Sequence, residues 1–134
     1  MTEKEIFCTD RAPEPKGPYS QAVIHNGLLY ISGQVAIDPV KGELLRGTIE
    51  EETEVVLNNI KTIVEEAGAG IKDILKVTCY LADMVDFERF NNVYKTFFSK
   101  DPPARTALQA GRLPLDVQVE IDAITALPGY QNVE

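Results

Sequence analysis

The sequence has few of the residues that most often carry nucleophilic or metal chemistry. Its 134 residues include two cysteines, one histidine and no tryptophan. Cys8 and Cys79 have no cysteine or histidine companion at metal-ligand spacing, so neither a zinc site nor a disulfide framework is expected. The single histidine, His25, stands in a His-Asn-Gly turn, which disfavours a Ser-His or Cys-His nucleophilic pair.

The sequence is also short of positive charge and of long apolar runs. Thirteen basic residues against 21 acidic ones give a formal net charge of −8, and no basic cluster offsets it. This balance repels a phosphate backbone and argues against nucleic-acid binding. No apolar stretch approaches the ~20 residues of a membrane span, and the first residues lack the basic and apolar regions of a signal peptide. We therefore expect a cytoplasmic protein with no membrane or nucleic-acid partner.

The composition favours one folded domain covering residues 1–134. A hydrophobic content of 44% with 25% charged residues is ordinary for a globular chain of this length, and no linker or internal repeat divides it. A local arginine can still bind a small anion despite the negative net charge, because a partly desolvated site feels near charges more than screened distant ones.

Hydrophobic periodicity and turn residues predict the elements. Asn26-Gly27 between two apolar runs, 20–25 and 28–33, predicts a hairpin, because both turn positions require positive φ. Apolar residues at spacings of three and four predict a helix of about twenty residues from about Thr48. A strand follows at 74–81. Asp83 or Asp86 can begin a second helix, whose apolar stripe consists of Phe87, Phe90, Tyr94 and Phe97.

The C-terminal third holds the most informative pair of charged residues. Alternation places Arg105, Ala107 and Gln109 on one side of a strand, and it points Glu120 away from the apolar side of a second strand. Residues 112–116 have turn chemistry that is expected to fold these two strands together. We expect the guanidinium and the carboxylate to converge on a site for a small anion.

These elements define an α+β fold in which two helices cover one face of a mixed sheet of at least five strands. Strands such as 74–81 carry apolar or bulky residues on both sides. The face away from the helices therefore needs cover, which predicts an oligomer.

Four motifs occur in order along the chain. They are Gly-Pro-Tyr-Ser-Gln-Ala at 17–22, Ser-Gly-Gln at 32–34, Asn-x-x-Tyr-x-x-Phe-Phe at 91–98, and Pro-Ala-Arg at 103–105 followed by Arg-Leu-Pro at 112–114 and Val-Glu-Ile-Asp-Ala-Ile at 119–124. The set resembles the RidA (YjgF-type) family of enamine/imine deaminases. The resemblance implies a chorismate mutase-like fold, a homotrimer with sheets facing inward, and one site in each cleft between neighbouring subunits.

The same resemblance implies a cofactor-independent and metal-independent hydrolase. Its substrates would be reactive 2-enamine or 2-imine acids such as 2-iminopropanoate and 2-iminobutanoate, converted to 2-keto acids and ammonia. Arg105 and Glu120 would be catalytic, Arg105 holding the substrate carboxylate and Glu120 placing the water. The substrate-binding set would be Tyr19, Ser32, Gly33, Asn91, Arg105 and Ala107.

Simpler structural roles exist for each of these residues. Arg105 could be paired to a surface acid, Glu120 could face solvent, Tyr19 could pack on a turn, and Asn91 could be a satisfied buried amide. Two features also depart from the family pattern. Many relatives have cysteine where this chain has Ala107, and Asp101-Pro102-Pro103 replaces a segment that often carries an aromatic residue. We expect water-based hydrolysis to survive the first change and substrate preference to respond to the second.

Two other functions compete with the deaminase. The first is a non-catalytic module that binds 2-keto acids through Arg105. The second is a ribonuclease or translation inhibitor, which the acidic charge balance and the lack of a His/Lys acid-base set disfavour.

Overall fold

The Asn26-Gly27 turn forms the first hairpin of the protein. A computed structural model describes residues 3–130, and in it Asn26 and Gly27 have φ angles of 51° and 77°. They join β2 (Ala22–His25) to β3 (Leu28–Gln34) in an antiparallel pair. The predicted hairpin is confirmed.

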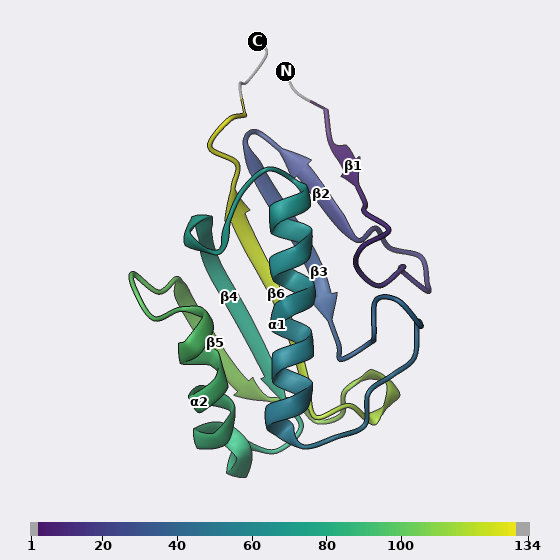
Figure 1. Ribbon diagram of the computed structural model, residues 1–134, viewed down its shortest axis with the longest axis vertical. Helices are drawn as coiled ribbons and strands as arrows, with labels where there is room; N and C mark the ends of the chain where they lie inside the picture. The colour runs from purple at the N-terminus through teal and green to yellow at the C-terminus, as the bar shows by residue number, and fades with distance from the viewer. Residues whose placement is uncertain (1–2, 131–134) are drawn as a thin grey trace.

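The hairpin belongs to a six-stranded mixed sheet (Figure 1). Its spatial order is β1-β2-β3-β6-β4-β5, and β4 with β5 is the parallel pair. The remaining strands are β1 (Glu5–Phe7), β4 (Ile74–Leu81), β5 (Ala104–Gln109) and β6 (Val119–Ala126). The sequence pattern did not indicate β1, because three residues are too few to show alternation.

The predicted pairing of the two C-terminal strands is wrong. β4 lies between β5 and β6 and pairs with both, so residues 110–118 connect strands that are not neighbours. This connection contains a short 3₁₀ turn, Pro114–Asp116, in which Leu115 and Asp116 have positive φ. Residues 112–116 do contain a turn, as expected. A turn sequence does not determine which strands pair, and here β4, from earlier in the chain, lies between the two strands that the turn connects.

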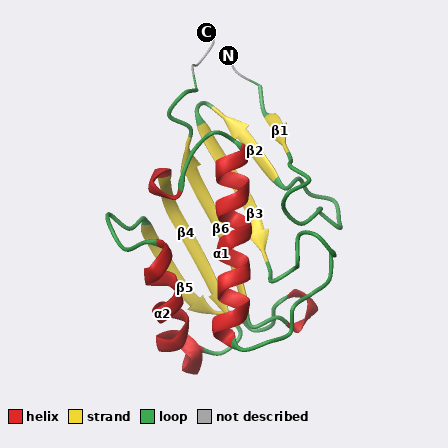
Figure 2. Cartoon of the chain, in the orientation of Figure 1, coloured by secondary structure: helices red, strands yellow, loops and turns green. Residues whose placement is uncertain are grey.

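Two helices pack on one face of the sheet, as predicted (Figure 2). In α1 (Ile49–Glu66), Thr48 and Glu51 form a reciprocal capping box at the start. In α2 (Phe87–Phe97), Asp86 precedes the helix without a side-chain capping bond, whereas Asp83 accepts a bond from the Val85 N–H and starts a 3₁₀ turn at Met84–Asp86. The chain therefore enters α2 through a 3₁₀ turn that Asp83 caps, and the helix itself begins after Asp86.

The strands have a buried face under the helices and an open face opposite. Side chains of β6 alternate strictly, with Val119, Ile121, Ala123 and Thr125 buried and those between them half-buried. Strand register extends this division across the sheet, so that Glu120, Tyr80 and Leu108 share one row of the open face. Tyr30 and Leu108 on this face remain 41% and 39% exposed, which leaves apolar surface uncovered in a single chain.

A buried carboxylate fixes the start of β6 to α1. Glu52 is 3% exposed, and its two oxygens accept bonds from the Gln118 backbone N–H at 3.1 Å and side-chain amide at 2.6 Å. The same amide donates to the Gly47 carbonyl at 2.7 Å. These bonds hold the segment two residues before Glu120.

Among residues 3–130, no helix is both long enough and apolar enough to cross a membrane.

Candidate active site

Arg105 lies on the helix-facing side of edge strand β5, against α2. One guanidinium nitrogen, Nη1, donates to the Asn91 side-chain oxygen at 2.7 Å. The guanidinium carbon lies 5.5, 6.0 and 4.6 Å from the ring centres of Phe87, Phe90 and Tyr94. These four positions lie on one face of α2, because Phe90, Asn91 and Tyr94 follow Phe87 at spacings of three, four and seven residues. The aromatic stripe predicted as core therefore also forms a cradle for the guanidinium.

The partners of Arg105 in this cradle are all neutral. None of the ion pairs found in residues 3–130 involves Arg105. An amide oxygen and aromatic faces orient the guanidinium without cancelling its charge. The simpler interpretation of Arg105 as paired to a surface acid is therefore wrong for the described residues, and the predicted site residue Asn91 lies beside Arg105.

Glu120 lies on the other side of the sheet, on central strand β6, and its carboxylate covers Gly33. A β-carbon at Gly33 would overlap the Glu120 carboxylate, so glycine is needed there for close approach. Ile31 pairs with Ala123 and Gln34 with Ile121, so β3 has an extra residue and bulges at Ser32–Gly33. This bulge, which the sequence pattern did not indicate, brings together the predicted site residues Gly33 and Glu120.

Ser32 and Tyr19 border the same region. The Ser32 hydroxyl donates to the Ser20 carbonyl at 2.6 Å, so its first role is to hold the segment before β2. Tyr19 is 52% exposed, and it lines a small pocket with Gly33 and Gln34. Tyr19, Ser32, Gly33 and Glu120 thus form one group of predicted site residues.

Two open-face residues next to Glu120 were not predicted as site residues. Tyr80 is directly opposite Glu120 on β4, and its hydroxyl donates to the Asp122 carboxylate at 3.0 Å. Burial raises the pKa of Glu120, and the negative charge of Asp122 raises it further. Alternation along 77–81 separates Tyr80 from Val77, Cys79 and Leu81, which lie on the buried face, and this was the available signal.

Ala107 lies on the helix-facing side with Arg105, in register with Cys79 of β4. Burial raises the pKa of the Cys79 thiol to about 12, so it stays protonated at neutral pH. Cys79 is a buried core residue, so its thiol does not provide a reactive group beside Ala107.

The predicted site residues thus form two groups on opposite faces of one sheet. Arg105 shares the helix-facing side with Val77 and Ala123, whereas Glu120 shares the open face with Tyr80 and Leu108. The sheet separates the guanidinium from the carboxylate within one chain. A pocket that contains both residues requires a second copy of the protein.

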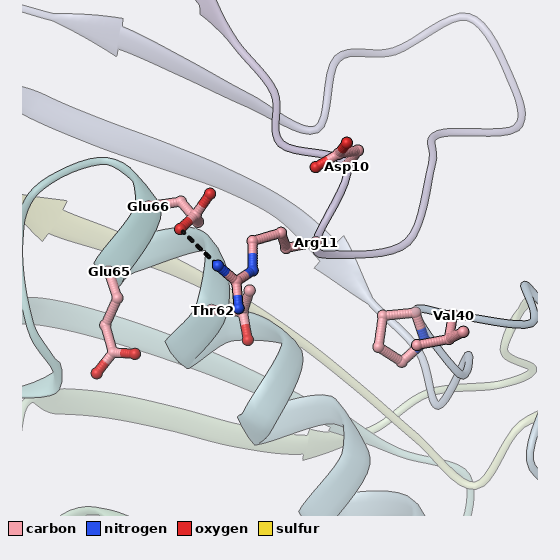
Figure 3. Close-up of a pocket in the computed structure, with 7 residues that line it drawn as sticks. Asp10, Arg11, Val40, Thr62, Glu65 and Glu66 are labelled. Atoms are coloured by element: carbon pink, nitrogen blue, oxygen red, sulfur yellow. Dashed lines mark ion pairs between the residues drawn. The ribbon is translucent and has the colours of Figure 1, made fainter.

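The hollow shown in Figure 3 lies elsewhere, between the N-terminal segment, the loop at Pro39–Val40 and the end of α1. Its volume is about 650 Å³, and its one arginine, Arg11, is ion-paired with Glu66 at 4.0 Å. It contains none of the predicted site residues. Separately, no three histidine, cysteine, aspartate or glutamate side chains within residues 3–130 gather in a way that could hold a metal ion.

The protein is thus a single α+β domain whose candidate site contains Arg105, held by uncharged side chains, and the half-buried Glu120. The family described as Endoribonuclease L-PSP matches residues 9–127. The chain therefore belongs to this family, in which the RidA and YjgF proteins are found, and the predicted resemblance is confirmed.

Individual relatives match over nearly their whole length. A RutC family protein of Pyrococcus horikoshii is 50% identical over 121 residues, which cover 90% of this chain and 96% of the relative. The mouse 2-iminobutanoate/2-iminopropanoate deaminase is 44% identical over 121 residues, 90% of each chain. The crystal structure of Escherichia coli TdcF with bound serine has a TM-score of 0.86 at 38% identity, covering 91% of this chain and 98% of TdcF.

Proposed function

We propose that the protein hydrolyses small 2-enamine and 2-imine acids, such as 2-iminopropanoate and 2-iminobutanoate, to 2-keto acids and ammonia. The reaction would take place in the clefts of a homotrimer. The mouse relative is named for this activity, and TdcF binds serine, a small amino acid with a carboxylate. The observation that carries the proposal is the Arg105 guanidinium, which neutral groups orient and which forms no ion pair with a carboxylate of residues 3–130.

The first step in this proposal is capture of the substrate carboxylate. A guanidinium presents parallel N–H groups that match the two oxygens of a carboxylate, which orients the substrate as well as attracting it. The Asn91 bond and the ring of Tyr94 at 4.6 Å fix the plane of the guanidinium before the substrate arrives. Less conformational freedom is therefore lost on binding.

The second step is attack by water on the C=N carbon. An enamine first becomes the imine by taking a proton at its terminal carbon. Glu120 then accepts a proton from water as the oxygen bonds to the imine carbon, and it returns this proton to the nitrogen to give the carbinolamine. The remaining hydroxyl proton passes to the nitrogen as the C–N bond breaks, so that ammonia leaves with the bonding electron pair and the keto group is formed. The raised pKa of Glu120 suits this exchange, because the carboxylate is a stronger base than an exposed one.

The third part of the proposal is assembly. Since Arg105 and Glu120 face opposite sides of the sheet, we place the substrate between the α2–β5 edge of one subunit and the Gly33–Glu120 region of its neighbour. Packing of the open faces in a trimer would also bury the exposed apolar side chains of Tyr30 and Leu108. Backbone N–H groups at Gly33 and Ala107 would complete the carboxylate site.

Replacement of Arg105 tests the proposal. With a dehydratase supplying the imine, we expect Arg105→Ala to reduce the protein-dependent rate of keto-acid formation on the order of 10²-fold or more, because the substrate is no longer positioned. Arg105→Lys should keep weak binding without the fork and show a raised KM. Arg11→Ala, at an exposed arginine far from β5, is the matched control and should retain the parent rate. Undiminished turnover by folded Arg105→Ala would refute the role.

A second candidate is a module that binds 2-keto acids without turnover. The serine bound by TdcF and the pre-oriented Arg105 are compatible with it, since both concern binding alone. Calorimetry with 2-ketobutanoate and rate measurements on the same samples distinguish the two functions. A deaminase loses rate in Glu120→Gln and keeps ligand affinity, whereas a binding module accelerates nothing in either form.

A further inference from the structure

Tyr80, Glu120 and Asp122 form a cluster on the open face of the sheet. Glu120 and Asp122 are two residues apart on β6 and therefore point the same way. Tyr80 pairs with Glu120 across β4 and β6, and its hydroxyl reaches diagonally to Asp122 at 3.0 Å. All three side chains are partly buried. The Tyr80 phenol thus bonds to Asp122, whereas the neighbouring Glu120 is the carboxylate that covers Gly33.

The other groups around this cluster do not neutralise it. On β4, Thr78 is opposite Asp122, and Lys76 lies farther along the face with its ammonium bonded to the Thr106 hydroxyl of β5 at 3.2 Å. β5 presents Leu108 beside Tyr80, and β3 presents Tyr30 in the row of Ile124. Among the described residues of one chain, Asp122 is therefore the charged group that acts most directly on Glu120.

We propose that Asp122, oriented by Tyr80, is a positioning residue that makes Glu120 a stronger base for the proposed hydrolysis. A fixed negative charge beside a carboxylate disfavours its ionised form, and partial burial strengthens the effect by reducing screening. The phenol prevents Asp122 from turning away and partly neutralises its charge. Burial acts first on the pKa of Glu120 and Asp122 second, both in the upward direction. The inference rests on the proposed function only for the consequence in rate.

Two isosteric variants give opposite expectations. Asp122→Asn keeps an acceptor for Tyr80 and removes the charge, so the pKa of Glu120 should fall. Tyr80→Phe removes the donor and leaves the charge of Asp122 uncompensated, so the pKa of Glu120 should rise. Each shift should be about half a pH unit or more, which is about threefold in the ratio of the two protonation states. A purely structural cluster gives no reason for shifts of opposite sign.

The titration of Glu120 is measured directly by carbon-13 NMR of its carboxyl carbon in the assembled parent protein and in both variants. Glu120→Gln assigns the signal, and Glu54→Gln on the exposed side of α1 is the control that should leave the midpoint unchanged. Shifts of the same sign, or no shift in Asp122→Asn, would overturn the inference. This readout does not depend on turnover.

The pH dependence of kcat/KM then connects the cluster to the reaction. Because ionised Glu120 is the active form, the acid limb should move to lower pH in Asp122→Asn and to higher pH in Tyr80→Phe. If the NMR midpoints shift and the parent accelerates no imine decay, the proposed function fails while the electrostatic coupling stands. If the parent is active and its acid limb does not follow the NMR midpoints, the assigned role in catalysis is wrong.

Discussion

At the scale of single residues, the proposed function depends on how two charged groups are supported. The cradle of α2 holds the Arg105 guanidinium by one amide oxygen and aromatic faces, so its positive charge remains available to a ligand. The surroundings of Glu120 act against its charge, since burial and the charge of Asp122 both disfavour its ionised form and raise its pKa. In the proposed reaction, these environments suit Arg105 to bind an anion and Glu120 to take up a proton.

Gly33 provides a test at this scale. We expect Gly33→Ala to lower kcat on the order of 10²-fold, because the added methyl group occupies the place of the Glu120 carboxylate and a displaced base is poorly aligned. The fold should tolerate the change, since the atoms that must move are the end of a flexible side chain. Rate assays and thermal melts of the same preparation measure both effects.

The matched control is Gly111→Ala, where an added methyl group meets no atom within 4 Å. It should retain parent rate and stability. A fully active Gly33→Ala would show that the carboxylate position over Gly33 is not the productive one.

At the scale of elements, local patterns predicted α1, α2, the hairpin and β4 because each depends on spacings within a short window. The capping box at Thr48 and Glu51 and the turn at Asn26-Gly27 are local chemistry of this kind. The bulge at Ser32–Gly33 does not follow from local chemistry, because it is defined by a register shift between β3 and β6. The insertion of β4 between β5 and β6 likewise depends on pairing between segments distant in the sequence.

Glu52 connects two such distant elements and yields a prediction about stability. Glu52→Ala removes the acceptor of two Gln118 bonds and leaves a partly buried backbone N–H without its partner, which should cost about 1–3 kcal/mol. Urea unfolding at one fixed protein concentration measures the loss, since subunit association would otherwise change the midpoint.

Glu54→Ala, an exposed position two residues along α1, is the control and should change the unfolding free energy by less than about 0.5 kcal/mol. Because Gln118 lies two residues before Glu120, the Glu52 variant should also reduce the rate at temperatures where it remains folded. Equal stability of the two variants would mean that α1 does not anchor the start of β6.

At the scale of the whole molecule, the sequence predicted a site shared between subunits through family resemblance, and alternation alone did not require it. Alternation assigned Arg105 and Glu120 each to one side of its own strand. It did not relate the two strands to each other, because that relation passes through β4. Once the register is known, their opposite faces become the strongest reason for placing a second copy at the site.

This arrangement predicts complementation between two inactive variants. In Arg105→Ala every subunit lacks the guanidinium, and in Glu120→Gln every subunit lacks the base, so each homotrimer should be inactive. Random mixing in equal amounts creates clefts that combine an intact Arg105 of one subunit with an intact Glu120 of its neighbour. Such clefts are about a quarter of the total in a cyclic trimer, so co-expressed variants should recover about a quarter of the parent rate.

Native mass spectrometry of the co-expressed sample establishes that three-subunit species form and that they contain both variants. Separately expressed variants combined without exchange are the control and should show no recovery. A site built from one chain cannot be restored this way, because every chain carries one of the two lesions. Mixed trimers without activity would therefore contradict the shared cleft, even if Arg105 and Glu120 each proved essential.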